Sequence, residues 1–298
     1  MMAAVGAIAW LLLGTAAAWA HGGHGEAGGP GWTFDPWIIV PLFLSAGIYL
    51  KGFRALWQRG GTGRKARVRC ALFYAAGWLT LAGALVSPLH WLGEHLFSAH
   101  MVEHEIVMAV SAPLLVLARP GGVLLWAFQP RLRCFLAGFA RAGILAAGWA
   151  TLTRPLVATV LHGVAIWAWH APPLFEVAVE NVAIHRLQHL SFFLTGLLFW
   201  WALVRRGSPA SAAGHLFVTM THTGILGALI TFAPRVLYQV QTAQAQRWGL
   251  TPLQDQQLAG LIMWVPAGTV YAGAAIGFAA RWVRRSSEAW KANDALSP

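Results

Sequence analysis

Residues 98–117 read SAHMVEHEIVMAVSAPLLVL, and this stretch decides the class of fold. About 20 mostly apolar residues are the length that an α-helix needs to cross a bilayer. The stretch opens with His100 and His104, which are four residues apart and therefore share one face of a helix. Because ionisable side chains inside a membrane are costly, this pair is a candidate functional site.

Further apolar stretches of similar length flank it on both sides. Of the 298 residues, 57% are hydrophobic and only 10% are charged, whereas a soluble domain has about 25% charged residues. We therefore predict an all-α fold, a polytopic membrane bundle of about seven transmembrane helices that occupies residues 36–283. The other six expected spans are 37–57, 70–88, 155–169 (the shortest), 184–204, 215–233 and 258–283.

The first 20 residues are predicted to be a signal peptide, or alternatively an N-terminal span. Residues 3–20 are apolar and end in Ala18-Trp19-Ala20, a small-residue cleavage pattern, although no Lys or Arg precedes them. Either way, the Gly/His-rich tail 21–35 is expected outside the cytoplasm. After cleavage, the amine and imidazole of His21 together with His24 would chelate copper, and the alternative is a solvated tail without a ligand.

The basic residues predict the orientation. Of the 21 Lys and Arg residues, 18 lie at alternate ends of the expected spans, and the opposite ends hold only Arg186, Arg235 and Arg247. Since basic loops stay in the cytoplasm, the mature N-terminus is expected outside and the tail 284–298 inside. The net charge of +11 therefore comes from basic residues in the short loops between spans. We accordingly expect no nucleic acid as a partner.

The segment 132–153 is apolar enough to be another span, but Arg141 interrupts it. If it crossed the membrane, the basic residues of every later loop would face outward. We therefore predict an interfacial amphipathic helix on the cytoplasmic side. The two cysteines, Cys70 and Cys134, form no CxxC motif and are expected to be apolar fillers.

A second histidine pair has the same spacing as the first. His185 and His189 open the span 184–204, and His170 ends the span 155–169 on the same outer side. Neutral imidazole is the commonest metal ligand and suits copper, zinc and iron. We predict a metal site at the outer leaflet; the less specific interpretation is that each imidazole only caps its helix at headgroup level. The predicted ligands are His100, His104, His170, His185 and His189, with His90, His95, Glu103, Met101 and His222 as possible accessory residues.

Several other functions stay open at this point. Two facing helices with axial histidines could hold a haem. His100-Met-Val-Glu103-His104 also reads HxxEH, in which the Glu of a zinc hydrolase is the general base. A scaffold without metal is a further alternative, whereas transport has little support, because no continuous polar chain crosses the membrane. We expect no enzymatic activity.

Several sequence blocks resemble the CtaG family of cytochrome c oxidase assembly factors. They occur in the family's order and extend over about residues 36–283. The blocks are Ser87-Pro88-Leu89-His90, Glu94-His95-Leu96-Phe97-Ser98-Ala99-His100-Met101-Val102-Glu103-His104, Ala112-Pro113-Leu114-Leu115-Val116-Leu117, Trp169-His170-Ala171-Pro172, His185-Arg186-Leu187-Gln188-His189-Leu190-Ser191-Phe192, Gly227-Ala228-Leu229-Ile230-Thr231-Phe232-Ala233-Pro234 and Asp255-Gln256-Gln257-Leu258-Ala259-Gly260-Leu261-Ile262-Met263-Trp264-Val265-Pro266.

The resemblance implies a multi-pass protein of the bacterial inner membrane that helps to assemble a haem-copper oxidase of the respiratory chain. Its implied partners are cytochrome c oxidase subunits, and copper supply is the implied activity. One departure is Glu103, because Gln is common at this position in the family. A catalytic Glu is then no family requirement, which weakens the hydrolase hypothesis. The tail with His21 and His24 lies outside the resemblance.

Overall fold

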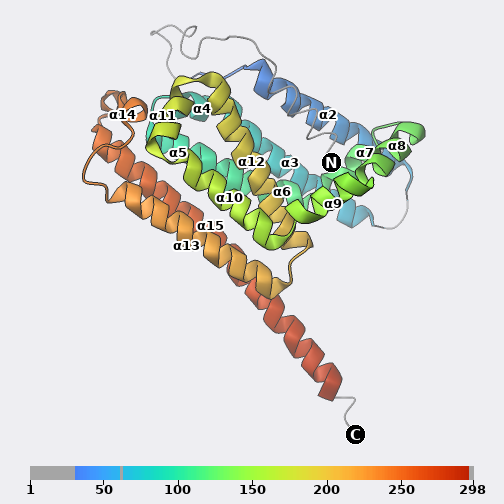
Figure 1. Cartoon of the computed structure of the whole chain (residues 1–298). Helices are drawn as coiled ribbons and strands as arrows, with labels where there is room; N and C mark the ends of the chain where they lie inside the picture. Colours follow the sequence, from blue (N-terminus) through green and yellow to red (C-terminus); the bar gives the residue numbers. More distant parts are fainter. Residues whose placement is uncertain (1–30, 61–62, 295–298) are drawn as a thin grey trace.

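The fold is all-helical, as predicted. The computed structural model describes residues 31–60 and 63–294, and these residues form helices without any β-strand (Figure 1). The predicted signal peptide and the candidate ligands His21 and His24 lie outside the described residues.

The helices follow one another along the chain with short connections. In order, they are α2 (Pro36–Gln58), α3 (Arg64–Val86), α4 (Pro88–Gly93), α5 (Phe97–Glu105), the π-helix η1 (Ile106–Ser111), α6 (Ala112–Leu117), α7 (Pro120–Leu125), α8 (Pro130–Ala140), α9 (Gly143–Leu152), α10 (Pro155–Trp169), α11 (Pro172–Glu180), α12 (Val182–Arg205), α13 (Pro209–Thr231), α14 (Gln239–Thr242), the 3-10 helix η2 (Ala245–Trp248) and α15 (Pro252–Asp294).

Six helical stretches of the described chain are long and apolar enough to cross a membrane. They are α2, α3, the continuous run Phe97–Leu117, α12, α13 and residues Pro252–Trp290 of α15. Each contains one of the expected spans or most of it. The remaining expected span, 155–169, forms α10 with the same bounds but has only 15 residues. The predicted membrane bundle is confirmed at the level of six candidate spans, or seven if the bent pair Pro130–Ala140 and Gly143–Leu152 forms one span.

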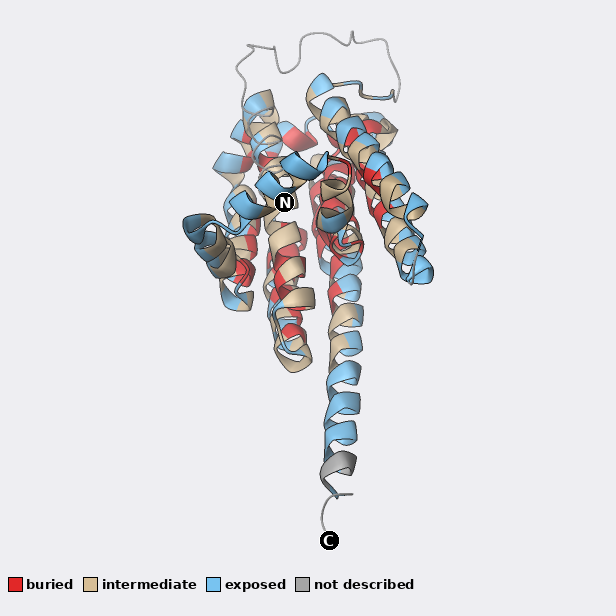
Figure 2. Ribbon diagram, turned by 90° about the vertical axis from the view of Figure 1, so that its right-hand side faces the viewer, coloured by how far each residue is buried: buried red, intermediate tan, exposed pale blue. Residues whose placement is uncertain are grey.

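Two segments differ in detail from the expected boundaries. Residues 132–153 belong to two helices, α8 and α9, which meet at an angle of 63° around Arg141; their place along the membrane surface stays a prediction. Helix α15 has 43 residues and continues past residue 283 without a break. At about 1.5 Å per residue it is roughly 65 Å long, so its last turns project beyond the other helices (Figures 1 and 2).

The run Phe97–Leu117 is the centre of the bundle. Of its span, 61% is buried, compared with 17–39% in the other five candidate spans. Helices α13 and α15 pack especially closely, because Gly227 and Gly260 lie at their contact. A Cβ added to Gly260 would be 2.7 Å from the carbonyl oxygen of Gly227.

One end of the bundle holds most of the predicted site. The short helices α4, α11 and α14 lie there, with the first turns of α5, α12 and α15 and the end of α10 (Figure 1). We call it the histidine end, because His90, His100, His104, His170, His185 and His189 all lie in these segments.

Candidate metal centre

The start of α5 is fixed by a residue from the other end of the sequence. Leu96 precedes the helix and provides no side-chain cap. Instead, the buried carboxylate of Asp255 in α15 accepts the backbone N–H groups of Phe97 and Ser98 at 2.8 and 3.0 Å. These are N–H groups that a helix cannot satisfy internally. The contact therefore fixes the position from which α5 carries its histidines inward.

Helix α12 begins with a cap of its own. The side chain of Asn181 accepts the backbone N–H groups of Ala183 and Ile184 at 3.0 and 3.3 Å, which is a typical N-cap. His185 and His189 follow on the next two turns, partly buried. Their Nε2 atoms are 2.8 Å apart, so the two rings meet one above the other on a single helix face.

Three imidazoles from these two helices converge. The ring centroids of His100 and His185 are 5.4 Å apart, those of His100 and His189 are 5.8 Å apart, and those of His185 and His189 are 4.5 Å apart. One nitrogen from each ring lies within 4.8 Å of the other two. Two nitrogens that bind one ion tetrahedrally at about 2.0 Å are roughly 3.3 Å apart, so small side-chain rotations would bring this trio around a single ion.

His104 and His170 lie next to this trio. The ring of His104 is 4.2 Å from that of His100 and 4.8 Å from that of His189, measured between centroids. His170 ends α10, and its ring lies 6.4 Å from that of His104. The structure thus brings all five predicted ligands together, although they come from three helices.

A buried carboxylate supports the cluster from one side. Glu103 is fully buried, and its Oε1 is 2.8 Å from Nδ1 of His90 and 3.7 Å from Nδ1 of His189. Burial lowers the pKa of His90, but the adjacent carboxylate of Glu103 outweighs it and raises the pKa to about 9. Gly93 allows this approach, since a Cβ there would be 2.9 Å from Oε2 of Glu103.

Many ring nitrogens of the cluster have no protein partner. Within the described chain, the buried atoms without a hydrogen bond include His100 Nε2, both ring nitrogens of His104, His170 Nε2 and His189 Nδ1. Buried polar atoms in proteins are normally hydrogen-bonded, since leaving one bare costs about 1–3 kcal/mol. Several imidazole nitrogens without hydrogen bonds in one place are typical of a site that binds a ligand.

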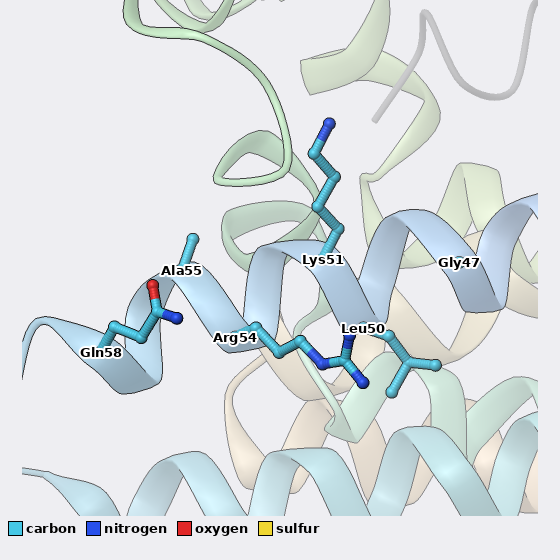
Figure 3. Close-up of a pocket in the computed structure, with 6 residues that line it drawn as sticks. All are labelled: Gly47, Leu50, Lys51, Arg54, Ala55 and Gln58. Atoms are coloured by element: carbon cyan, nitrogen blue, oxygen red, sulfur yellow. The ribbon is translucent and has the colours of Figure 1, made fainter.

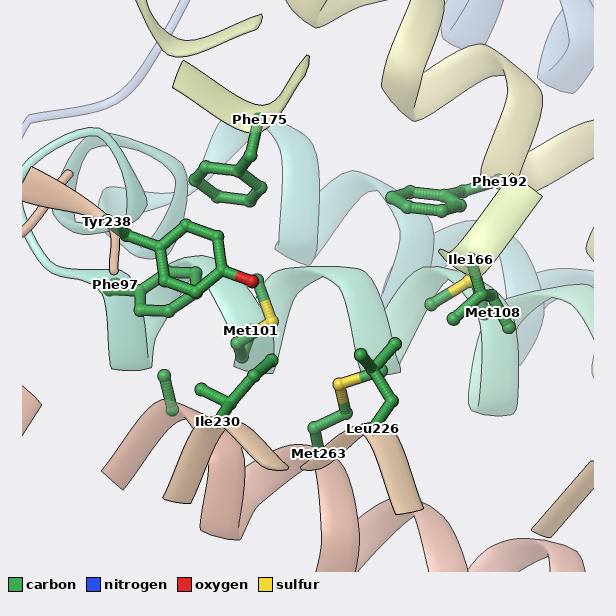
Figure 4. Packing of buried hydrophobic residues seen from close by; sticks show 11 residues of the cluster. Phe97, Met101, Met108, Ile166, Phe175, Phe192, Leu226, Ile230, Tyr238 and Met263 are labelled. Carbon is green, nitrogen blue, oxygen red and sulfur yellow. The ribbon is translucent and has the colours of Figure 1, made fainter. Parts of the chain in front are cut away.

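The remaining predicted accessory residues point elsewhere. His95 stacks on Trp91 and bonds to the Trp91 carbonyl oxygen at 2.7 Å. Met101 is buried in the apolar cluster beside α15, where it packs among aromatic rings (Figure 4). His222 lies in α13, where Nε1–H of Trp167 donates to its Nδ1 at 3.3 Å.

Sequence reasoning missed the residues that hold the histidine end together. Besides Asp255, they are the buried amides of Gln256 and Gln241. Gln256 accepts the N–H of Leu237 at 2.6 Å and donates to a carbonyl in the same loop, whereas Gln241 donates to the Gly93 carbonyl at 2.6 Å. The available signal in the sequence was Asp255 and Gln256, a carboxylate and an amide directly before an apolar span. Such side chains need buried hydrogen-bond partners.

Two surface hollows of the described chain lie away from this cluster. One runs along α2 and is lined by residues of that helix alone, among them Lys51, Arg54 and Gln58 (Figure 3). Another lies between α13 and α15, beside Gly224 and Trp264. Neither hollow contains a histidine. The candidate centre is a buried to partly buried cluster that lies in neither of these two hollows.

Comparison with known proteins identifies the family. The family profile of the cytochrome c oxidase caa3 assembly factor (Caa3_CtaG) matches residues 47–285, well over half of the chain. The chain belongs to this family. The resemblance noted in the sequence is thereby confirmed, and the five candidate ligands of this caa3 assembly factor family member all lie within the matched range.

Curated relatives come from mycobacteria and are longer. The uncharacterized protein Mb0105 of Mycobacterium bovis is 28% identical over 251 residues, which are 78% of this chain and 36% of the relative. The uncharacterized protein ML1998 of Mycobacterium leprae is 25% identical over 272 residues, 85% of this chain and 40% of the relative. The chain thus spans about two fifths of the length of these relatives. No solved structure matches it.

Proposed function

We propose that this caa3 assembly factor family member binds copper through the histidine trio and delivers it to a cytochrome c oxidase. The observation that carries the proposal is the convergence of His100, His185 and His189, whose ligand nitrogens lie within 4.8 Å of one another. The family supplies the client, a caa3-type oxidase, and the trio supplies a means of holding a metal ion.

Copper is favoured over haem by the packing around the rings. Phe175 lies against His100 and Phe192 against His104, with centroids 5.3 and 4.8 Å apart. A porphyrin would have to displace these rings and separate helices that already touch. A single ion requires only side-chain rotation. Imidazoles suit copper and zinc alike, so the choice between these two metals rests on the copper content of the client.

Glu103 supports a metal site rather than a hydrolytic one. Its Oε1 is engaged by Nδ1 of His90 and lies near Nδ1 of His189. A carboxylate that hydrogen-bonds the second nitrogen of a ligating histidine fixes the ring and raises its basicity, and Glu103 would do so for His189 if their 3.7 Å separation closed on metal binding. We assign this supporting role to Glu103 and propose no catalytic reaction.

The orientation predicted from the basic loops supports copper delivery on the outer side of the membrane. Most Lys and Arg residues lie at the opposite ends of the spans, so the histidine end would face outward. The copper centres of haem-copper oxidases lie in the outer half of the membrane or just outside it. A donor at this depth would deliver copper without moving it across the bilayer.

The decisive experiment is the metal content and visible absorption of the purified full chain after copper loading and washing. We expect the wild type to retain copper, and the His100→Ala/His189→Ala double variant to lose the equivalent that the trio holds. His222→Ala is the matched control, because it removes an imidazole from a span outside the cluster. Copper retained by the double variant at the wild-type amount would reject the trio as a copper site. A Soret band would indicate haem, retained zinc would favour the hydrolase, and no metal would leave a scaffold.

A further inference from the structure

Two histidines of the cluster are not needed by the trio. His104 and His170 are 1% and 3% exposed, so they are as deeply buried as His100 and more so than the partly buried His185 and His189. One nitrogen from each member of the trio lies close to the other two, but the group that meets this condition does not include His104 or His170. These two imidazoles therefore border the trio, with His104 in contact with it, without belonging to the group of three converging nitrogens.

The ring of His170 is held in one orientation and one tautomer. Its Nδ1 is 2.7 Å from the carbonyl oxygen of Ile166, so Nδ1 carries the proton and donates it. Nε2 is then a bare lone pair, buried and without a partner. The hydroxyl of Tyr238 donates to the His170 carbonyl oxygen at 2.7 Å and fixes the backbone beneath it. This arrangement is typical of a ligating histidine, whose other nitrogen donates to a carbonyl group.

His104, whose ring centroid lies 6.4 Å from that of His170, has two bare nitrogens of its own. Neither Nδ1 nor Nε2 has a partner, although the ring is almost completely buried. Phe192 contacts both rings, with centroids 4.8 Å from His104 and 5.9 Å from His170, and makes the surroundings apolar. The π-helix η1 begins two residues after His104; such distortions occur frequently at functional sites.

We propose that His104 and His170 form a second, inner binding position for Cu(I), next to the outer trio. The two ring centroids are 6.4 Å apart. Two imidazoles on opposite sides of one ion, each with a nitrogen at about 2.0 Å, have centroids roughly 6 Å apart. Cu(I) accepts this two-coordinate linear geometry, whereas zinc in proteins is almost always bound by four ligands.

His104 of the proposed inner pair contacts two members of the trio. The ring of His104 lies 4.2 Å from that of His100 and 4.8 Å from that of His189. A Cu(I) ion can therefore exchange one ligand at a time between the outer three-histidine position and the inner pair. The cluster would store one ion while the other is transferred. This inference rests on the proposed copper function and adds the number of ions and their arrangement.

The test is an anaerobic titration of the full chain in detergent with Cu(I), in competition with a chromophoric Cu(I) chelator. We expect two equivalents for the wild type and one for His170→Gln, a twofold loss, because glutamine keeps a donor for Ile166 but provides no imidazole. His222→Ala should bind two. Zinc should bind with one equivalent to wild type and His170→Gln alike.

Each result has a separate meaning for the two proposals. One tight equivalent in both wild type and His170→Gln would overturn the inner position and leave the trio as the copper site. No Cu(I) in the wild type would overturn both proposals. If His170→Gln does not fold, copper K-edge absorption of the doubly loaded wild type decides. A mean coordination number between two and three supports the pair, and four-coordinate copper throughout rejects it.

Discussion

Asp255 and Phe97 are 158 residues apart in the sequence, yet the carboxylate of Asp255 accepts the Phe97 backbone N–H at 2.8 Å. Through this contact and its neighbour to Ser98, the last helix of the protein caps the helix that carries His100 and His104. The position of the candidate metal centre therefore depends on a residue that is not among its ligands.

Removal of this cap should destabilise the histidine end. Asp255→Ala leaves two buried N–H groups without an acceptor, and we expect a loss of about 2 kcal/mol in the free energy of unfolding. Asp255→Asn keeps one side-chain acceptor and should lose less. Thermal unfolding of the three proteins in the same detergent measures this order, and an Ala variant as stable as the Asn variant would show that the cap is dispensable.

The close contact of α13 and α15 depends on Gly260. A Cβ at this position would lie 2.5 Å from Oγ1 of Thr231 and 2.7 Å from the Gly227 carbonyl oxygen, so the helices would have to separate. We expect Gly260→Ala to lower the unfolding temperature and to cost about 1–3 kcal/mol, as in overpacked cores.

Gly277 provides the matched control in the same helix. An added Cβ there meets nothing within 4 Å, and alanine has the higher helix propensity, so Gly277→Ala should be neutral or stabilising by up to about 1 kcal/mol. Equal effects of the two substitutions on the unfolding temperature would contradict the steric explanation.

Glu103 distinguishes a supporting carboxylate from a catalytic one. Glu103→Gln keeps the shape and one acceptor for His90 but loses the charge near His189. We expect Cu(I) affinity to fall by about 10–100-fold, with copper still bound, as for other residues that orient metal ligands. The oxidase of cells that express this variant should retain most of its activity when copper is plentiful. Complete loss of function with normal metal binding would instead favour the hydrolase.

Arg186 and Asp35 tie the segment before α2 to the helix that carries His185 and His189. Their N–O distance is 2.7 Å, and their side chains are 20% and 21% exposed. Because this ion pair is partly solvated, we expect Arg186→Gln to lower stability by no more than about 1 kcal/mol. The difference from the wild type should shrink as ionic strength rises. A loss that is larger and independent of salt would indicate that Arg186 has another structural role.

The sequence by itself determined the class of fold and the identity of the candidate ligands. A bilayer requires long apolar helices, and this requirement can be read from composition and span length without knowledge of packing. The i, i+4 pairs His100 with His104 and His185 with His189 follow in the same way from helix geometry. The sequence also showed that the expected span 155–169 is short, and α10 has these bounds.

The tertiary structure alone decided how these pieces combine. It brought together the nitrogens of His100, His185 and His189, moved His95 and His222 away from them, and selected Asp255 as the cap of α5. It also divided residues 132–153 into two helices. These features depend on contacts between residues far apart in the chain, where a carboxylate or an amide is satisfied only by the backbone that packing brings to it. Local periodicity specifies which face of a helix is polar, but only the packed bundle specifies what that face meets.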